Sequence, residues 1–277
     1  MKTIEHNLSE IKERLFFAHT MAKKAGEIAL SYFRKDLQCT YKLDNTPVSM
    51  ADRAVEEFLF GEIGLRYPQD SILGEETGEK NLRSDKAQKY RWIVDPIDGT
   101  ASFLKGMPFF SVLIGIESTN ETVAGVMHFP ALNETYFGAP GYGAFWDNSN
   151  QTSRKITVSH NNTIDRSTFV CASVDYFRAI GRPDLFGKIS AAAASTLGIP
   201  DAYAFALVAS GRADFIVEAE LNAWDIAAIK PIIEAAGGIF TDFHGKKTIY
   251  GRTAVASNLS ILSSLLRLIA GQPAAGK

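Results

Sequence analysis

Hydrophobic residues recur at helical spacing over residues 8–33, with polar residues between them. Ser9 is available as a cap near the start, so the pattern predicts one long amphipathic helix. A second helix is predicted to begin near Ala51, with Asp52 in or close to its first turn, and to end before Pro68, because a residue that precedes proline is biased away from the helical region. The apolar positions of the first helix are Ile11, Leu15, Phe16, Ala18, Met21, Ala22, Ala25, Ile28 and Ala29.

Short apolar runs further along the chain predict strands at residues 71–74 and 92–95. The polar stretch between them, residues 77–89, is expected to be an exposed loop. Residues 109–146 are rich in Val, Ile, Phe, Tyr and Gly, which predicts a run of antiparallel strands. Turn signals within that run stand at Asn120, Asn133 and Gly141.

The second half of the chain alternates helical and strand-like patterns. After an Ala-rich segment at 190–196, the pattern predicts a helix at 201–210, a strand at 214–218, a helix at 224–236 and a strand after Gly237. This alternation indicates a layered α/β architecture.

No internal repeat, Gly/Ser linker or low-complexity tract divides the chain. We therefore expect one continuous fold over residues 1–277, in which two lobes of about 1–150 and 151–277 remain an alternative. The last residues, 271–277, are expected to be a frayed tail.

Composition and charge argue against nucleic-acid binding and membrane insertion. The chain is 46% hydrophobic and 22% charged, and its formal net charge is -2, with 29 basic against 31 acidic residues. These values are typical of a globular protein and lack the basic footprint of nucleic-acid binding. No apolar run approaches the roughly 20 residues that span a bilayer, and the start lacks the apolar region of a secretory signal. We therefore expect a cytoplasmic protein that binds neither nucleic acid nor membrane.

The two cysteines, Cys39 and Cys171, are isolated from each other and from any histidine cluster. They fit neither a disulfide framework nor a zinc site, and we expect both to be buried small hydrophobes.

The segment DPIDGT carries the clearest candidate chemistry. Asp95 and Asp98 follow an apolar strand where the chain turns, with the Ile97 carbonyl between them, so three oxygens face a hard cation such as Mg²⁺. Gly99 allows close approach of the backbone, and the amides of Gly99 and Thr100 at a helix start could hold a phosphate. Asp and Gly are also common in turns, so spacing alone leaves a plain loop as an equal alternative.

Other acidic residues stand at the ends of predicted elements. Glu75 and Glu76 follow a strand, where they could supply a metal site or belong to a solvated loop. Asp225 stands at a helix start, where it could serve as an N-cap, and Asp52 is favoured in a first turn by the helix dipole alone.

Together these segments resemble the inositol monophosphatase family of Mg²⁺-dependent, lithium-sensitive phosphatases across nearly the whole chain. The matching blocks, in family order and separation, are residues 44–52 (DNTPVSMAD), 73–76 (LGEE), 92–103 (WIVDPIDGTASF) and 224–238 (WDIAAIKPIIEAAGG). The resemblance implies an αβαβα sandwich, usually a homodimer. It also implies that Thr100, with Asp52, orients and activates the attacking water. The implied metal ligands are Glu75, Asp95, the Ile97 carbonyl, Asp98 and Asp225.

The chemistry of phosphate ester hydrolysis accounts for this collection of residues. A phosphate monoester dianion repels a nucleophile, so catalysis requires neutralised oxygens, an in-line water and a stabilised leaving group. Two or three Mg²⁺ ions per site could supply all three. The five histidines are scattered outside the matching blocks, and we expect them to be structural or surface residues.

The resemblance implies that the alcohol group of the substrate meets Glu218 and the segment before it, which contains Asp201. Residues 201–204 (DAYA) resemble the histidinol-phosphate phosphatase branch of the family, whereas Ile199 and Pro200 depart from the paired glycines of that branch. Two acids would suit a cationic leaving group such as histidinol's ammonium. We therefore expect L-histidinol-phosphate hydrolysis, in histidine biosynthesis. The expected substrate-binding residues are Asp98, Gly99, Thr100, Asp201, Glu218 and Asp225.

Three alternatives stay open at this point. The substrate could be inositol 1-phosphate, or the enzyme could be a broad-specificity sugar-phosphate phosphatase. The acidic cluster could also hold a structural metal in a scaffold protein that is not an enzyme.

Overall fold

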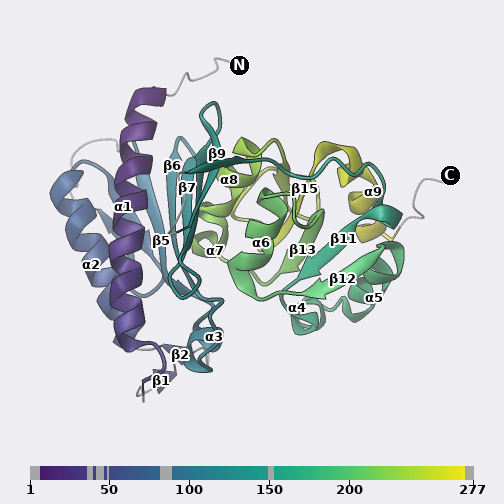
Figure 1. Cartoon of the computed structure of the whole chain (residues 1–277), viewed down its shortest axis with the longest axis horizontal. Helices are drawn as coiled ribbons and strands as arrows, with labels where there is room; N and C mark the ends of the chain where they lie inside the picture. Colours follow the sequence, from purple (N-terminus) through teal and green to yellow (C-terminus); the bar gives the residue numbers. More distant parts are fainter. Residues whose placement is uncertain are drawn as a thin grey trace.

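The computed structural model describes residues 7–35, 40–41, 47–48, 50–81, 89–148 and 153–271 (Figure 1). Several predictions fall outside these residues: Cys39, positions 44–46 and 49 of the first matching block, the centre of the 77–89 loop, and the tail from 272 onwards. Among the described residues, no helix is both long and apolar enough to cross a membrane.

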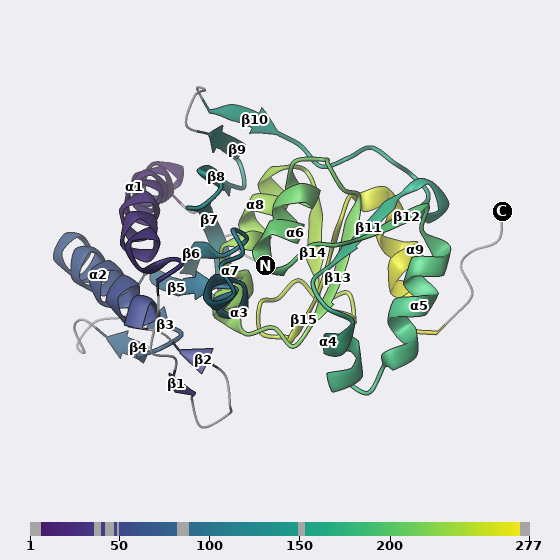
Figure 2. The same ribbon diagram turned by 60° about the horizontal axis from the view of Figure 1, so that its bottom comes forward.

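The described elements form five alternating layers, seen in both Figure 1 and the turned view of Figure 2. Helices α1 (Leu8–Tyr32) and α2 (Met50–Arg66) cover one face of an eight-stranded sheet. Helices α6 (Asp201–Ala209), α7 (Ala223–Ala227) and α8 (Ile229–Ala235) lie between this sheet and a five-stranded one. The outer layer consists of α4 (Val174–Ala179), α5 (Pro183–Ala192) and α9 (Leu259–Ile269). The predicted αβαβα sandwich is therefore confirmed.

The larger sheet is antiparallel except where β3 runs parallel to β5. Its predicted turns are confirmed, since Asn120, Asn133 and Gly141 all have positive φ angles between strands. In spatial order the strands are β10 (Arg154–Ile156), β9 (Gly143–Asn148), β8 (Glu134–Ala139), β7 (Glu121–Phe129), β6 (Ser111–Ser118), β5 (Arg91–Asp98), β3 (Ser71–Gly74) and β4 (Gly78–Asn81).

The smaller sheet is mixed, with β11 parallel to both its neighbours and β15 antiparallel to both of its own. Its spatial order is β12 (Ser195–Gly198), β11 (Thr168–Cys171), β13 (Phe215–Ala219), β15 (Thr253–Ser257) and β14 (Ile239–Thr241). The remaining elements are a pair of short strands, β1 (Thr40–Tyr41) and β2 (Pro47–Val48), the helix α3 (Thr100–Leu104) and the 3-10 helix η1 (Ile164–Arg166).

The first helix agrees closely with its hydrophobic pattern, and most of its predicted apolar positions are buried against the larger sheet. Ile28 is half-buried, and the side chain of Phe16 is exposed. The cap also differs from expectation: Asn7 precedes the helix, and its side-chain oxygen accepts the Ser9 amide at 3.0 Å. Ser9 lies inside the helix.

Three further boundaries differ from the sequence prediction. The expected 77–89 loop begins with a strand, because β4 pairs with β3. The strand expected at 92–95 extends to Asp98. The helix expected at 224–236 is divided at Ala228, because Pro231 has no N–H for the Ala227 carbonyl and its ring crowds that carbonyl.

Two glycines let the middle helices pack closely on the larger sheet. A Cβ at Gly115 on β6 would lie 2.6 Å from the Ala227 carbonyl carbon, and one at Gly125 on β7 would collide with the Ala228 carbonyl oxygen. Because these two glycines have no side chains, the junction between α7 and α8 packs directly against the strands. The start of α7 therefore lies close to the end of β5.

Candidate active site

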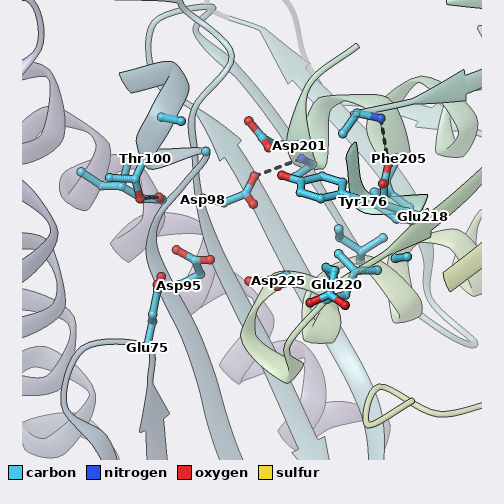
Figure 3. Close-up of a pocket in the computed structure, with 18 residues that line it drawn as sticks. Glu75, Asp95, Asp98, Thr100, Tyr176, Asp201, Phe205, Glu218, Glu220 and Asp225 are labelled. Carbon is cyan, nitrogen blue, oxygen red and sulfur yellow. Dashed lines mark hydrogen bonds between the residues drawn. The ribbon is translucent and has the colours of Figure 1, made fainter. Parts of the chain in front are cut away.

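The end of β5 carries a β-bulge that places two predicted ligands on one side of the sheet. Asp95 pairs with Leu113 and Asp98 with Ser111, so β5 has one more residue than β6 over this stretch. On a regular strand, residues three apart point to opposite faces. The extra residue cancels that alternation, and both carboxylates line the same cavity of about 220 Å³ (Figure 3).

The turn after the bulge is fixed by Gly99 and Thr100. Gly99 has a φ of 80°, and a Cβ there would lie 2.6 Å from Oδ2 of Asp201. The Thr100 hydroxyl donates a hydrogen bond to the Ile97 carbonyl oxygen at 3.2 Å. Gly99, Thr100 and Ile97 all line the cavity, as predicted.

Asp98 uses one of its oxygens to join the two halves of the site. Its Oδ2 accepts hydrogen bonds from the Ser111 hydroxyl and from the Ala202 amide, both at 3.0 Å. Burial raises the pKa of Asp98 well above its usual value, and the nearby charges of Asp201 and Asp225 raise it further. The two hydrogen bonds oppose that shift.

Asp225 belongs both to the capping of α7 and to the cavity. Its Oδ2 accepts the backbone amide of Asn222 at 2.6 Å, which stabilises the start of α7. Its side chain also lines the cavity, as that of Asp95 does. Burial, with the charge of Glu75, raises the pKa of Asp225 to about 7. Asn222 is the N-cap of α7, so the N-cap interpretation of Asp225 is wrong: Asp225 supports the helix start as the N3 residue of a capping box, and it lines the cavity as well.

Asp95 is the most crowded of these carboxylates. Its pKa is raised well above the usual value, first by burial and then by the charges of Glu75, Asp98, Asp225 and Asp52. Its Oδ1 is buried without a hydrogen-bond partner in the structure. Buried carboxylates this close together repel one another, so they must bind either protons or a cation.

The remaining predicted residues differ in where they lie. Glu75, at the turn between β3 and β4, lines the cavity, whereas Glu76 lines a separate pocket beside α2. Of this pair, Glu75 is therefore the residue that faces the cavity. Asp52 is buried in the first turn of α2; it is not among the cavity-lining residues but is close enough to act on Asp95 electrostatically.

The donor set fits Mg²⁺. Carboxylate and carbonyl oxygens converge on the cavity, and no Lys, Arg or His is among the lining residues that the structure describes. Within the described ranges, no three His, Cys, Asp or Glu side chains are close enough to form a ready-made metal cage. Mg²⁺ does not require one, because it binds through one or two carboxylates and keeps several waters or substrate oxygens.

The opposite wall of the cavity brings together Asp201 and Glu218. Asp201 begins α6 with a φ of 55°, and its Oδ2 accepts the Ser102 hydroxyl at 3.1 Å. Glu218 on β13 is 2% exposed; its Oε2 accepts the Ala172 amide at 2.8 Å, and its Oε1 is buried without a partner. Burial raises the pKa of Glu218 to about 8.

Several cavity residues were not predicted from the sequence. Tyr176 of α4, Phe205 of α6 and Glu220 after β13 complete the wall around Asp201 and Glu218 (Figure 3). Glu220 has a φ of 59°, and its Oε2 pairs with Arg252 at 3.0 Å. No motif marks these positions, because their place in the wall depends on how α4 and α6 pack against the sheet.

The chain is similar to known proteins over most of its length. The model of the inositol monophosphatase family matches residues 10–272. A histidinol-phosphatase of Chlorobaculum parvum is 37% identical over 92% of this chain and 96% of its own. An inositol-1-monophosphatase of Mesorhizobium japonicum is 33% identical over 90% and 92% of the two chains.

A solved structure extends the agreement to the fold. The extragenic suppressor protein suhB from Bartonella henselae superposes with a TM-score of 0.81 at 30% identity, covering 91% of this chain and 96% of its own. The chain therefore belongs to the inositol monophosphatase family and is a phosphoric monoester hydrolase.

Proposed function

We propose that this phosphatase hydrolyses L-histidinol phosphate, in histidine biosynthesis, with Mg²⁺ as its cofactor. The observation that carries the proposal is the acidic wall formed by Asp201 and Glu218 in a cavity where none of the described lining residues is basic. A substrate whose alcohol group bears an ammonium ion is favoured there over a neutral polyol, because a buried carboxylate gains most from a charged partner.

The β5 end of the cavity would bind the metal ions. Glu75, Asp95, the Ile97 carbonyl, Asp98 and Asp225 would hold two or three Mg²⁺, and the family is generally Mg²⁺-dependent. When bound, these ions would neutralise the phosphate oxygens, lower the pKa of a water and stabilise the leaving alkoxide.

Thr100 and Asp52 would orient the attacking water. Because the Thr100 hydroxyl donates its hydrogen to the Ile97 carbonyl, the lone pairs of its oxygen are left to accept a hydrogen bond from a water and so orient it. Asp52 would be the general base that receives the proton this water loses as it attacks. The amides of Gly99 and Thr100, at the turn after the bulge, would hold the phosphate oxygens in line with that water.

The alcohol group would then lie against the opposite wall. Glu218 has a buried oxygen without a partner, which would accept a hydrogen bond from the substrate ammonium or hydroxyl group. Asp201 would contribute a second charge, and the aromatic ring of Tyr176 would provide a flat surface for the imidazole.

The relatives support the reaction class more firmly than the substrate. One is named as a histidinol-phosphatase and another as an inositol-1-monophosphatase, at similar coverage. Hydrolysis of inositol 1-phosphate is therefore the second candidate, and sugar phosphates are the third.

A panel of phosphate esters tests the proposal. Purified protein with Mg²⁺ should release phosphate from L-histidinol phosphate with a kcat/KM at least about tenfold above that for inositol 1-phosphate, corresponding to about 1.4 kcal/mol of discrimination. A clear preference for inositol 1-phosphate would refute it. Absence of phosphate release from every ester would instead favour the structural metal-binding scaffold.

The same family membership leads us to propose a homodimer located in the cytoplasm, built from one continuous domain with two lobes. Light scattering of the purified chain and limited proteolysis near residue 150 would check the assembly and the domain boundary.

A further inference from the structure

The buried acid Glu56 has no role in the proposed reaction. Its side chain contacts the turn that carries Glu75. Glu56 is on α2, one helical turn after Asp52, so both side chains are on the same face of the helix. Each is 1% exposed. An acid this deeply buried requires partners that stabilise its charge.

Its hydrogen-bond partners among the described residues belong to the turn that carries Glu75. Gly74 of β3 pairs with Gly78 of β4, which leaves residues 75–77 as the turn. The Glu56 carboxylate accepts the backbone amides of Glu76 at 2.9 Å and Thr77 at 2.7 Å, and also the Thr77 hydroxyl. Both carboxylate oxygens are therefore used to hold this turn.

Contact with Gly74 completes the arrangement. A Cβ at Gly74 would collide with Oε2 of Glu56, so the glycine allows the carboxylate to lie against the end of β3. Glu75 is consequently fixed from both sides, because the residue before it and the residue after it each contact Glu56. The side chain of Glu75 then points into the cavity shared with Asp95 (Figure 3).

We infer that Glu56 is a positioning residue for the metal site: it holds the β3–β4 turn so that Glu75 faces Asp95, and it couples that turn to the helix that carries Asp52. The inference rests on the proposed metal site. Groups that orient a metal ligand commonly change metal affinity about 10- to 100-fold when they are removed.

The test compares Glu56→Gln with Glu57→Gln in the full-length protein. Glutamine keeps one acceptor oxygen, but it replaces the other with an NH₂ group. That group cannot accept a hydrogen bond from a backbone amide, so the turn loses part of its hydrogen bonding to α2. Glu57 is the neighbouring acid on the exposed face of α2, and its replacement makes the same change in charge. Mg²⁺ binding is measured by isothermal titration calorimetry, and phosphate release is measured as a function of Mg²⁺ concentration.

We expect Glu56→Gln to weaken Mg²⁺ binding about 10- to 100-fold and to recover most of its kcat at saturating Mg²⁺. Glu57→Gln should stay within about twofold of wild type, as a surface change does. A residue that only stabilised the fold would lower the melting temperature without weakening Mg²⁺ binding by the folded protein. That result would overturn the inference.

A second variant tests the position of the Glu56 carboxylate without changing the net charge of the protein. Gly74→Ala keeps both carboxylates but displaces that of Glu56, and it should weaken Mg²⁺ binding in the same direction. If either variant is poorly folded by circular dichroism, the other decides. If the wild-type protein binds Mg²⁺ and is activated by it, and the folded variants bind Mg²⁺ equally well, the role of Glu56 is refuted while the proposed function is not. Wild-type protein that neither binds Mg²⁺ nor is activated by it refutes the proposed function and this inference with it.

Discussion

Ala202 donates its backbone N–H to Oδ2 of Asp98 over 3.0 Å. This hydrogen bond ties the turn after β5, where metal and phosphate would bind, to the start of α6, where Asp201 would meet the alcohol. The two ends of the cavity come from segments about a hundred residues apart, yet they share one carboxylate. A change at Asp98 can therefore affect both chemistry and specificity.

Asp98→Asn and Thr100→Ala should both fold and lose phosphate release by about 10²-fold or more, the range typical of groups that act on the attacking water or its metal. The asparagine retains an oxygen that can accept from Ser111 and Ala202. Because burial and the neighbouring acids raise the pKa of Asp98, its neutral replacement should also raise the melting temperature of the metal-free protein. Steady-state kinetics and differential scanning calorimetry check both effects.

Asp184→Asn is the control for both variants, because Asp184 is an exposed acid bonded to Lys188. Full activity in Thr100→Ala would remove Thr100 from the mechanism.

Glu218→Gln should lower kcat/KM for L-histidinol phosphate by about 10- to 100-fold, the loss expected when a hydrogen bond to a charged group is replaced by one to a neutral group. Hydrolysis of glycerol phosphate, whose alcohol group is uncharged, should fall much less. Asp201→Asn should act in the same direction, with a smaller effect because Asp201 is less deeply buried. Equal losses on both substrates would show that these acids do not recognise the positive charge.

The same Glu218 should make the stability of the metal-free protein depend on pH. Its pKa is raised from the ordinary 4.5 to about 8 by burial, so the folded state binds a proton that the unfolded state releases. The resulting stability is fully present below about pH 4.5 and is lost as the pH rises through about 8. Urea unfolding with a chelator between pH 5 and 9 should show a smaller decline for Glu218→Gln than for wild type. Parallel curves for the two proteins would contradict a raised pKa at this position.

Gly125→Ala should destabilise the fold by about 1–3 kcal/mol or more, because the new methyl group would collide with the backbone carbonyl oxygen of Ala228, which cannot move without shifting the α7–α8 junction. Gly61→Ala is the opposite case: nothing lies within 4 Å of its Cβ position in the interior of α2. That change should stabilise by about 0.5–1 kcal/mol. Denaturant unfolding of the two variants should therefore give opposite signs, and a neutral Gly125→Ala would contradict the close approach.

The sequence predicted well those features that depend on near neighbours along the chain. The apolar spacing of α1 and the turn residues of the β6–β9 run act within a few positions, so local periodicity and turn chemistry determine them. Where prediction failed, the cause was often still local but was not recognised, as with Pro231 interrupting the helix at 224–236 and Asn7 replacing Ser9 as the cap.

The acidic residues themselves could be selected from the sequence, because their types and spacing suit a hard cation and a phosphate. Their geometry could not. Only the bulge in β5 brings Asp95 and Asp98 to one face, and only the packing of α2 against the β3–β4 turn brings Glu56 to Glu75's neighbours. These contacts join distant segments, so they depend on how helices and strands pack rather than on any local pattern. The sequence by itself determined the kinds of groups present; the tertiary structure decided which of them face each other across the cavity.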